Sequence, residues 1–246
     1  MPTAAAVVRA LGPIDARSVA RDSMLRWLVV TPIAYGLAFR WGVPVLRAWL
    51  DERYGFDLAP HYPLLASFLV LITPALVGAV VGFLLLDQRD DRTLTALQVT
   101  PLTVEGYLAY RIAVPMVVSV PVMMASVAIS DLATMGVVPA FAAAAQAAPT
   151  APLFALFAAA FATNKVQGFA LLKGVGVLTW PPVIAWFVAS PWQVAFGLDP
   201  LYWPLKVFWM LETGEPRVWL YFLAGLAYQW LLIALLVRRF KAVVTR

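Results

Sequence analysis

Three aspartates in one short segment are the residues of this sequence whose spacing most directly suggests chemistry. Asp87, Asp90 and Asp91 could hold Mg²⁺ against a diphosphate, because clustered carboxylates bind this ion. Two basic residues, Arg89 and Arg92, interrupt the cluster and would oppose a cation, and no second aspartate cluster follows. We therefore interpret the segment as a charged loop rather than a metal site.

The sequence offers few other groups for catalysis or cofactor binding. It contains no cysteine and one histidine, His61, which excludes disulfides, thiolate metal sites and histidine clusters. No motif serine lies near His61, so a hydrolase triad is not expected. The phosphate-binding motif G-x-x-x-x-G-K-[ST] is also absent. We expect no enzyme activity, no metal and no cofactor on this chain, and any ATP must be bound by another polypeptide.

The composition is that of an integral membrane protein. Of the 246 residues, 63% are hydrophobic and 13% are charged, whereas about 45–50% and about 25% are usual in soluble domains. A bilayer core of about 30 Å needs about 20 apolar residues per helix, so the chain can form several spans within one domain, residues 1–246. The net charge of +5 comes from bases that flank apolar runs, so no nucleic-acid partner is expected.

Six apolar runs predict an all-α polytopic membrane protein. The expected transmembrane helices cover about residues 25–45, 62–86, 107–130, 138–162, 169–190 and 217–238. Thirteen of the eighteen basic residues flank one side of these spans and four flank the other, which places both termini in the cytoplasm. No cleaved signal peptide is expected before the first run.

Two segments outside the spans are expected to lie in the membrane interfaces. Residues 13–24, opening at Pro13, predict an interfacial elbow helix, although a solvated tail fits their imperfect periodicity equally well. Residues 192–211 are too apolar for an ordinary external loop, and Pro200 and Pro204 interrupt them too often for a span. They predict a shallow re-entrant hairpin on the external side.

The charged loop between the second and third spans has the features of a transmission element. Asp91 can cap a short helix that carries Leu94 and Leu97. Thr100–Pro101 can start a second helix that continues into the third span, so force on the first helix would have a rigid path into the membrane. The residues predicted to couple the chain to a soluble partner are Asp91, Arg92, Thr93, Leu94, Leu97, Thr100, Pro101 and Glu105.

This loop resembles the cytoplasmic coupling loop of the ABC-2 type transporter permeases. That family carries a charged cluster, a Thr-Leu pair, a Thr-Pro or Ser-Pro step and a basic residue near the third span. The matching residues here are 89–92, Thr93–Leu94, Thr100–Pro101 and Arg111. Three further segments are similar to the fluoroquinolone-export-type permeases of actinobacteria: 84–91, 164–170 and 180–182. The chain departs from the common pattern at Arg92, where a glycine often precedes Thr-Leu.

The resemblance implies the membrane subunit of an exporter in a bacterial cytoplasmic membrane. Two ABC ATPase subunits would carry ATP and Mg²⁺, and a second permease, identical or homologous, would complete the pathway within the membrane lipid. The second and fifth spans would line the route, and the first and fifth would meet across the dimer. The cargo would be an apolar or amphipathic solute, a drug-like compound or a lipid, because the spans offer few polar groups.

Two features within the spans bear on packing and on the solute route. The consecutive Pro181 and Pro182 predict a bend at membrane depth, either facing the solute or simply kinking the helix. The residues assigned to the substrate pathway are Trp180, Pro181, Pro182 and Trp186. Residues 78–82 form a GxxxG spacing, which predicts close helix packing within the subunit.

Two other functions fit a membrane protein of this size. A stand-alone secondary multidrug transporter usually carries an intramembrane carboxylate or histidine, or oxygen ligands for a cation, and no carboxylate or histidine falls well inside the predicted spans. A non-transporting scaffold or sensor is the other alternative. An ATPase gene beside this one would favour the exporter over both.

Overall fold

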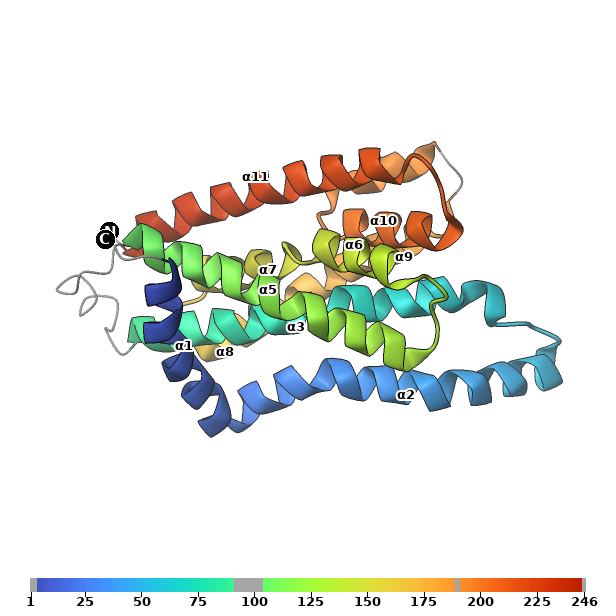
Figure 1. The fold of residues 1–246 in the computed structure, drawn as a ribbon, viewed down its shortest axis with the longest axis horizontal. Helices are drawn as coiled ribbons and strands as arrows, with labels where there is room; N and C mark the ends of the chain where they lie inside the picture. The colour runs from blue at the N-terminus through green and yellow to red at the C-terminus, as the bar shows by residue number, and fades with distance from the viewer. Residues whose placement is uncertain (1–3, 91–103, 189–190, 245–246) are drawn as a thin grey trace.

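The computed structural model describes residues 4–90, 104–188 and 191–244, and all regular structure in these ranges is helical (Figure 1). The α-helices and the short 3₁₀ helices, written η, are α1 (Ala4–Arg21), α2 (Ser23–Tyr54), η1 (Ala59–His61), α3 (Tyr62–Asp90), α5 (Val104–Ser130), α6 (Val137–Ala147), α7 (Thr150–Phe161), α8 (Lys165–Val175), η2 (Gly176–Thr179), α9 (Trp180–Ala185), η3 (Trp192–Leu198), α10 (Tyr202–Thr213) and α11 (Val218–Val244).

Six helical stretches of the described residues are long and apolar enough to cross a membrane, which confirms the predicted all-α fold and number of spans. They are α2, η1 with α3, α5, α6 with α7, α8 with η2 and α9, and α11. The first continues past its expected end near residue 45 to Tyr54. It stops there because Gly55 adopts the left-handed conformation, φ 63°, and its N–H caps the helix.

The first and last described helices reach the same end of the bundle. Figure 1 shows that α1 begins and α11 ends at one end of the molecule, where α3 also ends and α5 begins. An even number of spans requires this arrangement. The segment predicted to couple to an ATPase therefore leaves the bundle on the side of both termini.

Two of the predicted spans are interrupted. The fourth breaks between Ala147 and Thr150, where Pro149 has no N–H to continue the helix. The fifth consists of α8, the 3₁₀ turn η2 and the short α9, whose first turn contains Pro181 and Pro182. Proline is tolerated in a first turn, since the N–H groups there have no partner within the helix. The backbone therefore changes helix type before the prolines.

The elbow helix starts earlier than predicted. The expectation that it opens at Pro13 was wrong, because α1 runs from Ala4 to Arg21 with Pro13 in its interior. The turns before the proline are held by burial of Val7 and Leu11 in a cluster with Tyr107 and Leu108 of α5. Burial of large apolar side chains, at about 1.5–3 kcal/mol each, offsets the hydrogen bond that the proline removes.

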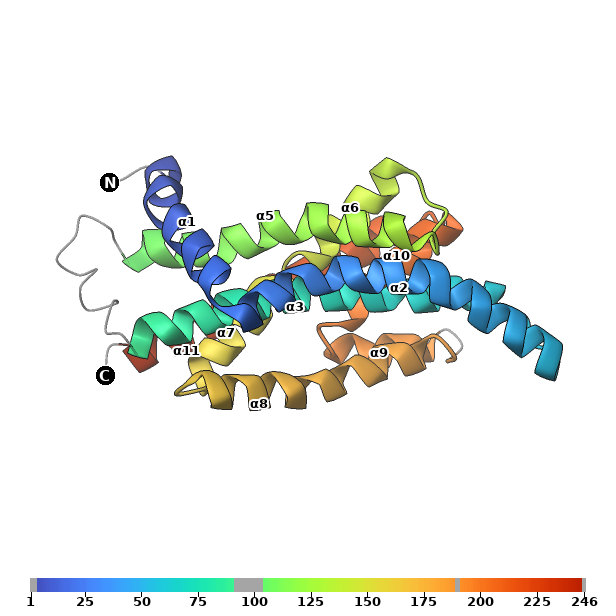
Figure 2. The same cartoon turned by 90° about the horizontal axis from the view of Figure 1, so that it is seen from below.

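The chain turns sharply from α1 into α2. Asp22 accepts hydrogen bonds from the N–H groups of Met24 (2.9 Å) and Leu25 (3.2 Å), and so caps α2. Figure 2 shows α1 crossing the end of the bundle steeply, while α2 runs along its length. This is the geometry expected of an elbow.

The centre of the bundle is the contact between α3 and α7. A Cβ added to Gly78 would lie 2.1 Å from the carbonyl oxygen of Ala151, and one on Gly82 would lie 3.2 Å from the Cβ of Ala158. Both partners are fully buried small residues. The prediction that residues 78–82 pack within the subunit is therefore confirmed.

The hairpin between the fifth and sixth spans consists of η3 and α10, and α10 is buried against the bundle. Leu205, Phe208 and Met210 of α10 are buried, and Trp209 donates a hydrogen bond from Nε1 to Ser67 Oγ at 2.6 Å. Trp203, also in α10, donates a hydrogen bond from Nε1 to the carbonyl of Gly197 at 2.9 Å. These contacts attach α10 to α3 and close the hairpin.

Asp199, in the turn before α10, should make stability rise as the pH is lowered. Burial raises the pKa of its carboxyl to about 6, although the N–H of Leu201 donates to Oδ1 at 2.9 Å. A carboxyl whose pKa is higher in the folded than in the unfolded state favours folding when protonated. We expect the melting temperature to rise between pH 7 and pH 4 and to flatten in Asp199→Asn, measured by thermal unfolding in detergent. An equal slope in both proteins would contradict this.

Candidate functional site at the ends of α3 and α5

The segment predicted to act on an ATPase lies between the end of α3 and the start of α5. Of the residues assigned to it, Glu105 is described, while Asp91, Arg92, Thr93, Leu94, Leu97, Thr100 and Pro101 lie outside the described residues. The two helix ends that flank the segment are therefore what the structure can reveal. They carry a group of polar contacts that reaches α1, α2, α7, α8 and α11.

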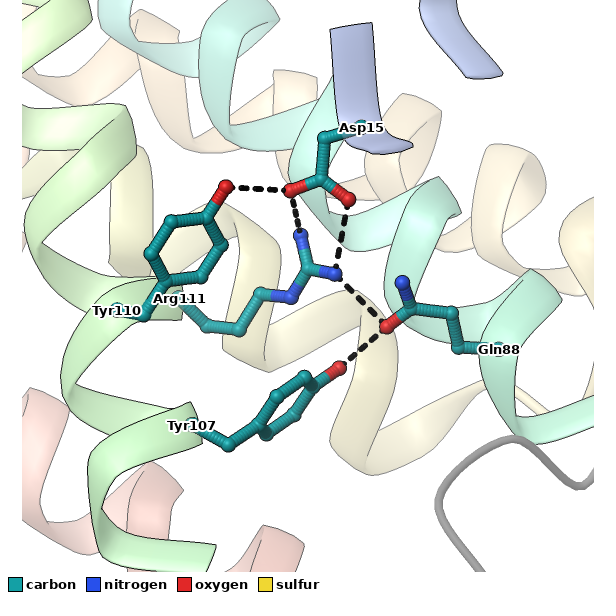
Figure 3. A network of polar contacts seen from close by, with 5 residues as sticks. All are labelled: Asp15, Gln88, Tyr107, Tyr110 and Arg111. Carbon is teal, nitrogen blue, oxygen red and sulfur yellow. Dashed lines mark hydrogen bonds and ion pairs between the residues drawn. The ribbon is translucent and has the colours of Figure 1, made fainter. Parts of the chain in front are cut away.

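Arg111, two turns into α5, is the centre of this group (Figure 3). Its guanidinium makes two parallel hydrogen bonds to Asp15 of α1, Nη1 to Oδ2 at 2.8 Å and Nη2 to Oδ1 at 3.1 Å. Nη2 also donates to Gln88 Oε1 of α3 at 2.8 Å. One side chain thus joins the elbow, the second span and the third span.

Two tyrosines complete the network. The hydroxyl of Tyr110 donates to Asp15 Oδ2 at 2.8 Å, and the hydroxyl of Tyr107 donates to Gln88 Oε1. The guanidinium carbon of Arg111 lies 5.2 Å and 5.3 Å from the ring centroids of Tyr107 and Tyr110. Such planar stacking and paired hydrogen bonds suit arginine and would be lost with lysine.

The ion pair is enclosed by the protein, so breaking it is expected to cost more than breaking a surface pair. The side chain of Arg111 is 1% exposed and that of Asp15 is 14% exposed. Surface ion pairs contribute about 0–1 kcal/mol, but removing one partner of a buried pair costs about 3–5 kcal/mol because the other charge stays desolvated. The elbow is therefore fixed to α5 by a contact that tolerates little displacement.

A second charged contact lies at the junction of α2, α3 and α8. Lys165, at the start of α8, pairs with Asp22 at 2.8 Å and with Asp87 at 2.9 Å. The hydrogen bond from Lys165 lowers the pKa of the Asp22 carboxyl, which also caps α2. The start of the fifth span is thereby tied to the elbow and to α3.

Two further bases connect the same level of the bundle. Arg89 Nη2 donates to the carbonyl of Ala162 at 2.8 Å, just beyond α7, where a cation also complements the helix dipole. Lys241 of α11 pairs with Glu105 of α5 at 3.2 Å. With Arg111 and Lys165, these contacts link all the spans to the two helix ends that flank residues 91–103. We call these four bases and their partners the polar platform.

The residues assigned to the substrate pathway do not gather at one site within this chain. Trp180 is 61% exposed on α9, whereas Pro182 is buried. Trp186 turns inward and packs against Trp209, with ring centroids 5.0 Å apart. Pro181 is half-buried.

Among the described residues, two of the apolar cavities between the fifth span and the rest of the bundle are well enclosed. One of about 280 Å³ lies between α3 and η2–α9, and the other of about 250 Å³ lies between α7 and α11. Phe154 and Leu201 line both, so they form the partition between them. Either cavity can take an apolar body, but neither lies at the polar platform.

The charged contacts hold the ends of several helices together. Among the described residues, no group of three or more His, Cys, Asp or Glu could hold a metal ion. The sequence analysis placed Arg111 near the start of the third span and residues 13–24, which include Asp15, in the elbow, but it missed the pairing of Arg111 with Asp15 and the roles of Gln88, Tyr107 and Tyr110. The available signal was a basic residue inside an otherwise apolar run.

Comparison with known proteins gives one family. A model of the family described as "Fluoroquinolones export permease protein Rv2686c-like" matches residues 15–237. Two curated relatives from Mycobacterium tuberculosis, fluoroquinolones export permease protein MT2760 of strain CDC 1551 / Oshkosh and fluoroquinolones export permease protein Rv2686c of strain H37Rv, are each 36% identical over 244 residues, covering 95% of this chain and 93% of theirs. No solved structure matches.

Proposed function

The chain belongs to the Rv2686c-like family of fluoroquinolones export permease proteins, and we propose that it is the transmembrane subunit of an ATP-driven ABC exporter. It is a multi-pass membrane protein with a transport permease role. In the proposal, ATP and Mg²⁺ are bound by two separate ATPase subunits, and a second permease, identical or homologous, completes the pathway. The observation that carries it is the polar platform, which connects every span to the ends of residues 91–103.

The mechanism follows from this connectivity. An ATPase that moves residues 91–103 would shift the end of α3 and the start of α5 together. Arg111 would pass that movement to α1, Lys165 to α8 through Asp87 of α3, and Arg89 to α7. Packed helices change position as rigid bodies rather than by bending. The displacement would therefore reach the cavities between the fifth span and the bundle.

The cargo is proposed to be an aromatic, amphipathic molecule of the fluoroquinolone type. The names of the relatives and the apolar walls of both cavities support this choice. Trp180 remains a candidate for cargo contact, from the exposed face of α9. Both termini and residues 87–106 are proposed to face the cytoplasm of a bacterial cell.

Inverted membrane vesicles would test the function directly. Vesicles containing the chain with a co-expressed ABC ATPase should accumulate norfloxacin when ATP is supplied, and vanadate should stop the accumulation. Uptake that persists with vanadate and collapses with a proton ionophore would instead identify a secondary transporter.

Aspartate at Leu94 or Leu97 is expected to uncouple transport from ATP hydrolysis. A carboxylate buried in an apolar subunit contact without a partner costs several kcal/mol, so the ATPase would no longer engage the loop. Transport should fall at least about tenfold, which a loss of about 1.4 kcal/mol already produces, while membrane insertion is unchanged. Gln98→Leu, in the same segment, is the matched control. Normal transport by the Leu94→Asp/Leu97→Asp double variant would remove the loop from the mechanism.

A single cysteine at Gln98 should react with a membrane-impermeant maleimide from the cytoplasmic side only. The chain has no cysteine of its own, so the background is clean. A cysteine at the exposed Glu215, between α10 and α11, should react from outside. External labelling at Gln98 would reverse the proposed topology.

A further inference from the structure

Two glutamines near the middle of their spans are fully buried. Gln229 of α11 is 0% exposed, and its Nε2 lies 3.4 Å from both Thr150 Oγ1 and the carbonyl oxygen of Pro200. These are long hydrogen bonds, since 2.7–3.2 Å is usual. Its Oε1 has no partner among the described residues.

Gln146 of α6 precedes Thr150 by four residues and faces α11 at Gly225, one turn before Gln229. A Cβ added to Gly225 would be 2.4 Å from Gln146 Nε2, so the amide lies directly against the α11 backbone. Gln146 is 0% exposed, and neither its Nε2 nor its Oε1 has a partner within the described part of the chain. We call Gln146, Thr150 and Gln229 the amide cluster.

The amide cluster is costly to the folded state. A buried polar group without a hydrogen bond costs about 1–3 kcal/mol, whereas an apolar residue of the same shape is nearly neutral or stabilising. Three amide atoms of the cluster carry this cost. Leucine at either position would therefore serve stability better, and the polarity indicates a function that requires hydrogen bonding.

The cluster lies behind the wall of the smaller cavity: none of its three residues lines the cavity, but Gln229 contacts the carbonyl of Pro200, which does. The cavity of about 250 Å³ is lined by Leu153, Pro200 and Leu232 among others. Leu153 and Leu232 follow Thr150 and Gln229 by three residues on their helices, and the carbonyl of Pro200 is the group that Gln229 approaches. Residues three apart share a helix face. Thr150 and Gln229 are thus each one turn from the cavity wall on α7 and α11, and Gln146 approaches α11 from α6.

The cavity of about 280 Å³ has no comparable polar cluster in its described lining. Its polar wall residues are Ser67 and Thr179. Ser67 donates to the carbonyl of Pro63 and accepts from Trp209, and Thr179 donates to the carbonyl of Gly176. Their hydroxyls are therefore already used within the protein, whereas the amide cluster has free donors and acceptors.

We propose that the smaller cavity and the amide cluster form one binding site for an amphipathic molecule. The apolar body occupies the space between Phe157 and Leu236, and a neutral hydrogen-bonding group, such as a ring ketone or an amide, is held by Gln146 and Gln229. Entry requires the long Gln229 contacts to open by the width of that group. The ligand is the export cargo itself, so the inference rests on the proposed function.

Direct binding to the purified chain tests the site without any ATPase. Norfloxacin, which is fluorescent, is titrated against the chain in lipid nanodiscs. Gln229→Leu and Gln146→Leu should each raise Kd about tenfold and leave the melting temperature unchanged or higher. Tyr228→Phe, which removes the exposed hydrogen bond from α11 to the carbonyl of Leu198, is the matched control and should change Kd less than twofold.

A second variant tests the apolar part. Leu232→Trp fills the cavity while leaving the amides in place, and it should abolish binding. An unchanged Kd in Gln229→Leu with a lowered melting temperature would overturn the proposal in favour of a structural or hydrating role, and so would an unchanged Kd in Leu232→Trp. If the chain in nanodiscs does not bind norfloxacin but the vesicles export it with ATP, the site is wrong and the proposed function stands.

Discussion

Arg111→Met should abolish export and lower the free energy of unfolding by about 3–5 kcal/mol, the cost of removing one partner from a buried ion pair. Methionine keeps the apolar stem but removes the guanidinium. Asp15 would then retain the Tyr110 hydroxyl as its remaining side-chain donor in a site where it is 14% exposed. Thermal unfolding in nanodiscs and ATP-driven uptake per folded protein measure the two losses separately.

Transport should fall by more than the loss of folded protein accounts for, because Arg111 connects α1 and α3 to α5, the helix that follows residues 91–103. Replacing both partners, in Asp15→Leu/Arg111→Met, removes the unpaired charge and should restore part of the stability but not transport. Arg40→Met is the control, since Arg40 forms an exposed pair with Asp131 at 3.8 Å and should cost about 1 kcal/mol or less. Additive stability losses in the double variant would show that Arg111 and Asp15 do not act together.

The parts of this fold that follow from local composition were predictable. Each span can be recognised as an apolar run, because a helix that crosses the bilayer lies in an apolar environment along its whole length. The hairpin before α11 was also predicted, since Pro200 and Pro204 divide an otherwise apolar segment. Helix ends were harder. Tertiary burial of Val7 and Leu11 extends α1 beyond the sequence signal at Pro13.

The contacts that position the candidate site were not predictable from one sequence. Asp15 and Arg111 are separated by 96 residues, and neither segment contains a signal that identifies the other as its partner. Their pairing depends on the angle at which α1 crosses the bundle, which Asp22 sets through its cap on α2. Charge placement gave the side of the membrane but not the partner.

The amide cluster escaped notice for a different reason. A search for intramembrane carboxylates and histidines passes over glutamine, which carries no charge and is common in soluble segments. Gln146 and Gln229 become informative only when their burial and free hydrogen-bonding atoms are known. The neutral character of the cluster is consistent with a cargo that lacks a strong net charge at its bound end.

The second large effect on stability is expected from substitutions at the contact between α3 and α7. Gly78 meets the backbone of Ala151 rather than a side chain, since a Cβ added to this glycine would lie 2.1 Å from the carbonyl oxygen and 2.9 Å from the carbonyl carbon. Backbone atoms cannot rotate away as a flexible side chain can. Any substituent at this position must therefore push the two helices apart.

Gly78→Ala is expected to destabilise the protein by about 1–3 kcal/mol or more through overpacking, and Gly78→Leu should prevent folding. The separation would reach Leu153 and Phe154 on α7, so the cavities on both sides of Phe154 would change shape and norfloxacin binding should weaken with stability. Gly42→Ala is the matched control, because a Cβ there meets nothing within 4 Å on α2 and alanine favours a helix by about 0.5–1 kcal/mol. Size-exclusion profiles and melting temperatures rank Gly78→Ala, Gly78→Leu and Gly42→Ala by stability. A Gly78→Ala protein as stable as Gly42→Ala would mean that α3 and α7 are farther apart than the structure places them, and would also remove the basis for the cavity beside α7.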